Sequence, residues 1–162
     1  MTEQASPGAE LSPEGLSDLM EFAEQLDLSD PGDAVERLER RFPFSGERIE
    51  RLGMALRRAK EAGEICQHGS EDLRYSRLFK AAETSFAMSA DAVWMRVAGP
   101  HHTHPNGEID LCFTTDGAPS FDGRAPGWTV YPPGSAHRPT VTGGAMMILY
   151  LLPGGEIVFT RA

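Results

Sequence analysis

The hydrophobic and polar positions of the chain follow two periods, and the first is helical. Between residues 12 and 64 the apolar side chains recur at three- and four-residue spacing, which predicts amphipathic helices. Ser12-Pro13, Asp30-Pro31 and Ser45 supply capping residues for three helices, and Gly63 can end the last one. The apolar faces are formed by Leu16, Leu19, Met20, Ala23 and Leu26, by Val35, Leu38 and Phe42, and by Ile49, Leu52 and Leu56. This helical segment is expected to cover one face of a sheet or to build a subunit interface.

From residue 65 to residue 162 the pattern changes to short alternating runs separated by glycine and proline turns, which predicts β-strands. The run at 146–152 is apolar on both faces and is expected to be a central strand. Many short strands at close spacing are typical of a β-sandwich or a β-barrel. The chain is therefore predicted to be mainly β, with a helical segment over 12–64 followed by one β domain over 65–162.

Composition and charge narrow the functional classes. The chain has 162 residues, enough for one domain with a substantial core, and its net charge of −9 argues against a nucleic-acid partner. No apolar run approaches the ~20 residues of a membrane span. Residues 1–11 are polar, unlike a signal peptide, and we expect them to be disordered. Cys66 and Cys112 form no disulfide pattern, so we expect a soluble cytoplasmic protein.

One stretch carries most of the side chains that can bind a metal. In an extended strand, alternate residues share a face. One face would then carry His102, His104, Glu108, Asp110 and Cys112, and the other Ile109, Leu111 and Phe113. A third imidazole, His137, follows the turn at Pro132-Pro-Gly134. This division between polar and apolar faces suggests a metal site inside a β-barrel.

Three imidazoles and one carboxylate suit a divalent first-row metal ion such as Fe, Mn, Zn or Ni. We expect this ion to be bound by His102, His104, Glu108 and His137. Four protein ligands leave one or two coordination positions open, as a catalytic metal requires. The alternative is that the same four side chains form a polar network without a metal.

Two short motifs resemble those of the cupin superfamily, namely His102-x-His104-x3-Glu108 and Pro132-x-Gly134-x2-His137. A longer series is similar to the 4-hydroxylaminobenzoate lyase family and comprises His102–Phe113, Phe121-Asp-Gly123, Gly127-Trp128, Pro132–Ser135, His137 and Leu149–Gly155. The resemblance implies a cupin-type β-barrel (double-stranded β-helix) preceded by about three α-helices. It also implies conversion of 4-hydroxylaminobenzoate and water to 3,4-dihydroxybenzoate (protocatechuate) and ammonia, in nitroaromatic degradation.

The chemistry of that reaction suggests roles for two of the ligands. The N–O bond must be activated by a Lewis acid or a proton donor, and the attacking water must lose a proton. We expect Glu108 and His137 to act in catalysis, with Glu108 as the base. The reaction requires no external oxidant, so we expect neither a nicotinamide nor a flavin.

The substrate is expected to be a small aromatic carboxylate, and its two parts need different contacts. The carboxylate calls for a cation, for which Arg96, Arg138 and also Arg124 are candidates. Trp128 is expected to pack against the ring, and Tyr150 to contact the substrate or to donate a proton. Core packing is the alternative role for these aromatic side chains.

Two other functional classes fit the same residues. The first is a cupin Fe(II) dioxygenase acting on a small aromatic acid, which would consume O2. The second is a non-catalytic cupin that binds a small ligand without turnover. In each case we expect a homodimer, because cupins often pair through their sheets, and neither a membrane nor a nucleic acid as partner.

Overall fold

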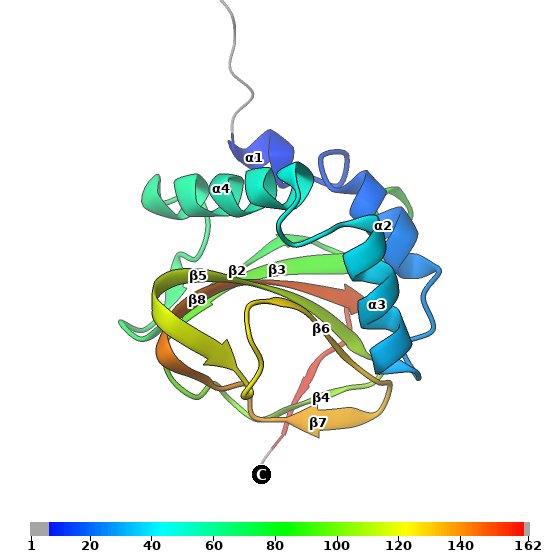
Figure 1. Cartoon of the computed structure of the whole chain (residues 1–162). Helices are drawn as coiled ribbons and strands as arrows, with labels where there is room; N and C mark the ends of the chain where they lie inside the picture. The colour runs from blue at the N-terminus through cyan, green and yellow to red at the C-terminus, as the bar shows by residue number, and fades with distance from the viewer. Residues whose placement is uncertain (1–6, 161–162) are drawn as a thin grey trace, which may run out of the picture.

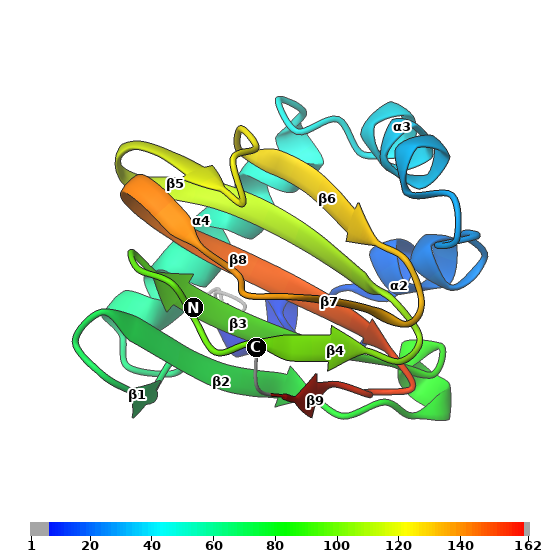
Figure 2. The ribbon, with the colours of Figure 1, turned by 90° about the horizontal axis from the view of Figure 1, so that it is seen from below.

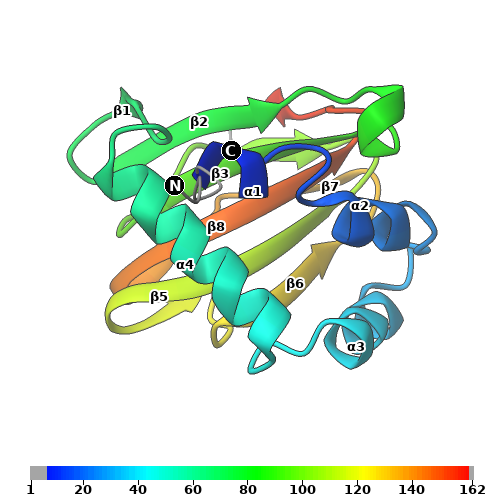
Figure 3. The ribbon, with the colours of Figure 1, turned by 90° about the horizontal axis from the view of Figure 1, so that it is seen from above.

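Four α-helices form the N-terminal part of the structure. The computed structural model describes residues 7–160. Its helices are α1 (Pro7–Glu10), α2 (Ser17–Glu24), α3 (Pro31–Arg41) and α4 (Glu47–Glu61). Their buried side chains share a core with one face of the main sheet, as predicted, and α4 lies across the strands of that sheet (Figure 3). Within residues 7–160, no helix combines the length and the apolar character needed to cross a membrane.

One of the three helix caps predicted from the sequence is present in the structure, and the other two differ from the prediction. Asp30 caps α3 as predicted, since its carboxylate accepts a hydrogen bond from a backbone N–H of the first turn. Ser12 caps only a short turn, and α2 begins after it. Ser45 does not cap α4, whose first residue follows Gly46 without a side-chain cap. Helix α4 therefore depends on its packing rather than on a side-chain cap.

The prediction that residues 1–11 are disordered is wrong for residues 7–11. Residues 7–10 form α1, and Leu11 is buried in the core shared by the helices and the sheet. Residues 1–6 lie outside the described residues, so the expectation for them stays a prediction.

Two antiparallel sheets follow the helices. Their strands are β1 (His68–Gly69), β2 (Leu73–Phe79), β3 (Met88–Met95), β4 (His102–His104), β5 (Glu108–Phe121), β6 (Gly127–Tyr131), β7 (Ser135–His137), β8 (Val141–Pro153) and β9 (Val158–Phe159), with a 3₁₀-helix η1 (Glu83–Ser85) between β2 and β3. The larger sheet has the order β1-β2-β3-β8-β5-β6, and the smaller has the order β7-β4-β9. Figure 2 shows the smaller sheet in front of the larger one, seen from below. The predicted mainly β fold with N-terminal helices is thus confirmed, as is the central position of 146–152, in β8.

Strand β5 separates two apolar cores by its alternation. Ile109, Leu111 and the partly buried Phe113 pack in the core that contains the helices. Cys112 packs on the other face, in a second cluster that includes Ile148. Figure 1 shows the helices above the larger sheet, and β4 and β7 below it. The even-numbered side chains at the start of β5 therefore point into the space between the two sheets, here called the lumen.

Trp128 lies in the helix-facing core, which corrects its predicted role in substrate binding. Its side chain is only 7% exposed. The indole N–H donates a hydrogen bond of 2.9 Å to the backbone carbonyl of Phe42, at the end of α3. This bond joins β6 to α3, so Trp128 is a residue of the helix–sheet interface.

We predict that Trp128→Phe lowers the free energy of unfolding by about 1–3 kcal/mol, because the buried carbonyl of Phe42 loses its hydrogen bond. Denaturant unfolding followed by circular dichroism measures the change. The other tryptophan provides the control: Trp94 donates to the Thr115 hydroxyl at 3.0 Å in a partly buried position. Water can replace that partner, so Trp94→Phe should cost less than about 1 kcal/mol. Equal losses in the two variants would contradict the assignment.

The ion pair between Arg48 and Asp18 joins α4 to α2 and makes stability depend on pH. The guanidinium binds both carboxylate oxygens, at 2.9 and 2.8 Å, and the hydrogen bonds from Arg48 lower the pKa of Asp18. A depressed folded-state pKa stabilises the protein above the unfolded value of about 3.9, and the contribution is lost as pH falls below it. We therefore predict that Arg48→Gln lowers the free energy of unfolding at pH 7 and that the difference from wild type shrinks below about pH 4.

The control for this titration is Arg51→Gln on the same helix. Arg51 pairs with Glu47 at 2.9 Å, but both side chains are exposed. Its substitution should change stability by less than about 0.5 kcal/mol at either pH. A pH-independent loss in Arg48→Gln would contradict the role of the Asp18 carboxylate.

Candidate metal centre and adjoining cavity

The four predicted ligands meet in the lumen. His102 and His104 come from β4, Glu108 from β5 and His137 from β7, and one ligand atom of each lies within 4.8 Å of the others. The Nε2 atoms of His102, His104 and His137 lie 3.5, 3.2 and 3.7 Å from the Glu108 carboxylate oxygens. His102 and His137 are register partners in the smaller sheet, and Glu108 faces them from the larger one. The four residues that the sequence motifs predicted as ligands therefore form one cluster in the structure.

Two turns fix the backbone around His104. Its carbonyl accepts hydrogen bonds from the N–H groups of Gly107, at 3.2 Å, and Gly134, at 2.7 Å. Gly107 has a φ of +87°, and a Cβ there would lie 2.9 Å from Leu28 and 3.0 Å from the carbonyl oxygen of Tyr131. Glycine is therefore required in the turn between β4 and β5.

The hydrogen bonds of the Nδ1 atoms determine the tautomer of each histidine. His102 Nδ1 lies 3.3 Å from the Pro100 carbonyl, which can only accept, so this nitrogen carries the hydrogen. His137 Nδ1 donates in the same way to the Asp122 carboxylate, at 2.6 Å. For both histidines, the lone pair of the neutral imidazole is then on Nε2, which faces Glu108.

His104 follows the same rule through a hydroxyl group. The hydroxyl of Ser135 donates to the Pro132 carbonyl at 2.6 Å, so its oxygen accepts from His104 Nδ1 at 3.0 Å. The lone pair of His104 is therefore also on Nε2. Histidines that bind metals commonly donate their second ring N–H to such a partner, which fixes the ring orientation.

The arrangement fits a divalent cation. Both oxygens of Glu108 and the Nε2 atom of His104 are buried and have no hydrogen-bond partner within residues 7–160. Burial alone would raise the pKa of Glu108, but the three histidines around it lower that pKa well below its ordinary value. An ionised carboxylate that faces three lone pairs in a buried site requires a positive charge among them. Three nitrogens and one carboxylate match the preferences of a first-row divalent ion.

Asp122 is a site residue that was not predicted from the sequence. Its Oδ2 accepts from His137 Nδ1 and from the Tyr131 hydroxyl, and its Oδ1 accepts from the N–H of Thr140 at 2.8 Å. Burial raises the pKa of Asp122, but these hydrogen bonds outweigh burial and lower it. The carboxylate therefore stays charged and orients His137. Its only sequence signal was its place in the Phe121-Asp-Gly123 motif.

Two further lumen residues lie beside the cluster on β5. Asp110 is completely buried, and both of its oxygens lack a hydrogen-bond partner in the described part of the chain. Its pKa is raised well above the ordinary value by burial and then by the charge of Glu108. Burial likewise raises the pKa of the Cys112 thiol, so Cys112 is a protonated core residue. This supports core packing for Cys112 instead of a nucleophilic role.

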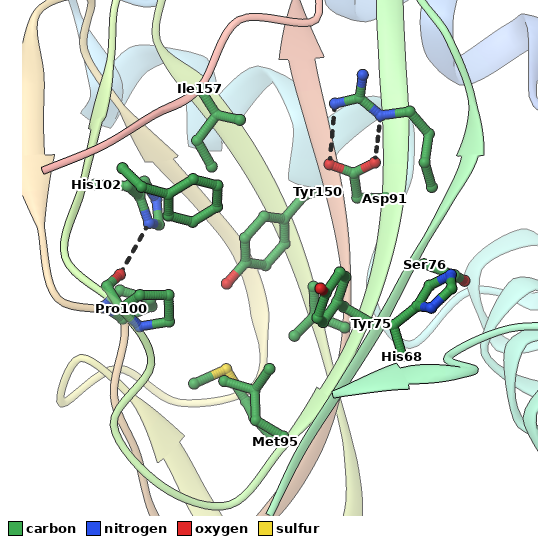
Figure 4. Close-up of a pocket in the computed structure, with 14 residues that line it drawn as sticks. His68, Tyr75, Ser76, Asp91, Met95, Pro100, His102, Tyr150 and Ile157 are labelled. Carbon is green, nitrogen blue, oxygen red and sulfur yellow. Dashed lines mark hydrogen bonds and ion pairs between the residues drawn. The ribbon is translucent and has the colours of Figure 1, made fainter. Parts of the chain in front are cut away.

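A cavity of about 540 Å³ adjoins the metal centre (Figure 4). His102 is part of its wall and connects it to the cluster. Its apolar lining includes Val93, Met95, Ile157 and Phe159. Tyr150 projects into it, with its ring centroid 6.5 Å from that of His102. The volume is in the range of small-molecule sites.

Of the predicted substrate contacts, the structure brings only Tyr150 to the cavity. Arg96 is exposed and pairs with Asp72 at 2.7 Å, outside the cavity wall. Arg138 donates to the carbonyl of Gly99 at 3.1 Å and does not line the cavity either. These arginines flank the motif in the sequence, but neither is part of the cavity wall. The predicted carboxylate-binding roles of Arg96 and Arg138 are corrected accordingly.

Comparisons with known proteins agree with the motifs of this site. A family model described as 4-hydroxylaminobenzoate lyase (PnbB) matches residues 17–159. The chain is 31% identical over 102 residues to a 4-hydroxylaminobenzoate lyase of Pseudomonas putida, and 34% identical over 94 residues to one of Nocardioides sp. (strain LMS-CY). Each alignment covers 53% of this chain, and 58% and 56% of the relatives, so the chain spans little more than half the length of these curated relatives. An RmlC-like cupin protein of Ralstonia eutropha JMP134 is similar in structure, with a TM-score of 0.43 and 15% identity over 60% of this chain and 65% of that chain.

We predict that Asp122→Asn weakens metal binding by about 10- to 100-fold, because the amide no longer holds His137 as a charged acceptor does. Competition with a chromophoric chelator for Zn²⁺ measures the affinity. Asp116→Asn, at an exposed position of β5, is the matched control and should bind the ion as wild type does. An unchanged affinity in Asp122→Asn would show that Asp122 does not orient the ligand.

Proposed function

The chain belongs to the 4-hydroxylaminobenzoate lyase family, and on this premise we propose that it converts 4-hydroxylaminobenzoate and water to 3,4-dihydroxybenzoate and ammonia. The observation that carries the proposal is the His102–His104–Glu108–His137 cluster, which opens through His102 into a mainly apolar cavity. Such a cavity accepts one aromatic ring and brings one of its substituents to the cluster. The reaction balances in atoms, since one water enters and one ammonia leaves.

We propose a divalent Fe, Mn, Zn or Ni ion as the cofactor, held by the three Nε2 atoms and Glu108. When bound, such an ion supplies Lewis acidity that weakens the N–O bond of the hydroxylamino group. The reaction is internally balanced in electrons, because the nitrogen gains the two electrons that the hydroxylated ring carbon loses. No second redox partner is needed.

The residues of the chain provide the proton transfers. Glu108 Oε2 lies within 3.7 Å of two imidazoles, whereas Oε1 faces only His102, at 3.5 Å. We propose that Oε1 accepts the proton of the water that adds to the ring carbon beside the nitrogen-bearing carbon. The proton taken up by Glu108 is proposed to return to the departing oxygen, while His137, whose Nδ1–H is held by Asp122, would keep its Nε2 lone pair for the ion. Hydrolysis of the resulting imine releases ammonia, and loss of the ring proton restores the aromatic ring.

The protein as a whole is proposed to act as a cytoplasmic homodimer. The absence of a disulfide pattern in the sequence supports the compartment. The helical segment over 12–64 and the β domain over 65–162 are proposed to form one functional unit, because they share a buried core.

A cupin dioxygenase remains the second candidate, because three histidines and one glutamate are equally suited to Fe(II). The two functions differ in their use of O2. A dioxygenase incorporates oxygen from O2, whereas the lyase takes its oxygen from water.

The deciding experiment is an anaerobic assay of the purified protein with 4-hydroxylaminobenzoate, before and after chelation. We predict equimolar protocatechuate and ammonia without O2, loss of both products on metal removal, and recovery on adding back the ion. Turnover that begins only when O2 is admitted would favour the dioxygenase. Product formation that survives verified metal removal would contradict metal assistance.

Glu108→Gln is predicted to lower kcat by about 100-fold or more, because the water loses its base. Circular dichroism and metal analysis would establish that the variant is folded and loaded. Glu61→Gln, at the exposed end of α4, is the control and should retain wild-type kcat. Near-normal kcat in Glu108→Gln would remove Glu108 from the catalytic role.

A further inference from the structure

One row of polar side chains crosses the lumen face of the larger sheet. Arg77 on β2 pairs in register with Asp91 on β3, Asp91 pairs with Tyr150 on β8, and Tyr150 pairs with Asp110 on β5. Register partners on neighbouring antiparallel strands point to the same face. The row therefore begins two residues from Glu108 and ends at Arg77. Three strand spacings, roughly 14 Å, separate the backbones at its two ends.

Arg77 is held in place by Asp91 but keeps donors free. Its Nε–H donates to Oδ1 of Asp91 at 2.8 Å, and an Nη2–H contacts Oδ2 at 3.4 Å. A guanidinium has five N–H donors in a rigid plane. Within residues 7–160, the remaining Nη1 group has no hydrogen-bond partner. An arginine oriented on one side by a carboxylate is prepared to bind a second carboxylate on the other.

Arg77 is also the only arginine or lysine among the described residues of the cavity wall. None of the three arginines expected from the sequence lines the cavity: Arg96 pairs with Asp72, Arg138 binds the Gly99 carbonyl, and Arg124 lies over the ring of Tyr131. Figure 4 shows Tyr150 between His102 and Asp91, with the ion pair of Asp91 drawn at the far side. The cavity thus has the metal centre at one end, a cation at the other and an aromatic side chain between them.

We propose that Arg77, positioned by Asp91, binds the carboxylate of the aromatic acid and directs its para substituent to the metal centre. The inference rests on the proposed function for the identity of that substituent. A para-substituted benzoate carries its two polar groups on opposite sides of one apolar ring. The cavity has the same order, with the ring against Tyr150 and apolar neighbours such as Val93 and Met95.

The test compares ligands that differ only in the charge that Arg77 would recognise. Binding of 4-hydroxybenzoate and of 4-hydroxybenzamide to the metal-loaded protein is measured by calorimetry. Arg77→Gln should weaken binding of the acid by about 10- to 100-fold, as expected for loss of a charge-assisted bond, and change binding of the amide by less than about threefold. Arg77→Lys keeps the positive charge but lacks the planar guanidinium, so its affinity for the acid should be intermediate. With 4-hydroxylaminobenzoate as substrate, Arg77→Gln should raise KM far more than it lowers kcat.

Arg37→Gln is the matched control. It removes the same charge from another Arg–Asp pair, in which Arg37 Nε lies 2.7 Å from Asp33 on the exposed face of α3. It should leave both affinities unchanged. Thermal melting and metal content show whether Arg77→Gln is folded. If it is not, the test uses Arg77→Lys, and the measured quantity is the ratio of its affinities for the acid and the amide.

The outcomes separate the two proposals. Wild-type affinity of Arg77→Gln for the acid overturns the inference, as does a selective loss of acid binding in Arg96→Gln or Arg138→Gln. If Arg77→Gln turns over 4-hydroxylaminobenzoate with an unchanged KM, the proposed lyase reaction is supported and the proposed role of Arg77 is contradicted. If the wild-type protein shows no lyase turnover but its binding of the acid depends on Arg77, the inference about Arg77 is supported and the proposed reaction is contradicted.

Discussion

A buried carboxylate among three imidazole lone pairs is the arrangement on which the rest of the lumen depends. Glu108 has no exposed surface, and the nearest nitrogens lie 3.2–3.7 Å away with their hydrogens committed to other acceptors. Such a group destabilises the folded protein unless positive charge is present. A divalent ion would supply that charge, and protons on the imidazoles would supply it without the ion. Metal loading and the stability of the barrel are therefore linked.

The same strand that carries Glu108 also attaches the helices. The odd-numbered residues Ile109 and Leu111 pack in the helix-facing core, while Glu108 and Asp110 face the lumen. A register shift of one residue would exchange the two sets and put carboxylates against the helices. The apolar packing of α2, α3 and α4 therefore fixes the side of the sheet on which the ligands lie. In this way the helical segment, which carries no ligand, determines the geometry of the metal centre.

The sequence predicts a site residue when the pattern that identifies it lies within a short stretch of the chain. The ligands His102, His104 and Glu108 lie within one short stretch, where strand alternation relates spacing to a common face, and His137 follows a recognisable turn. Arg77 could not be found in this way, because its place depends on the register of β2, β3 and β8, which are far apart in the chain. Trp128 was misplaced for the opposite reason, since nearness to a motif in sequence says nothing about which face of a strand a residue occupies.

The separation of Arg77 from the four-ligand cluster across the cavity bears on how the proposed reaction would be selected. A carboxylate is itself a good ligand for a first-row divalent ion, so an aromatic acid free to turn would bind the metal by the wrong end. In the proposed binding mode, the Arg77 guanidinium at the far wall would compete for that carboxylate, and its pairing with Asp91 holds the guanidinium there. In the proposed binding mode, the ring would lie along Tyr150 with its nitrogen substituent toward the four-ligand cluster. Since the ligand set alone suits both a lyase and an oxygenase, the choice of reaction depends on which group of the substrate the cavity delivers to it.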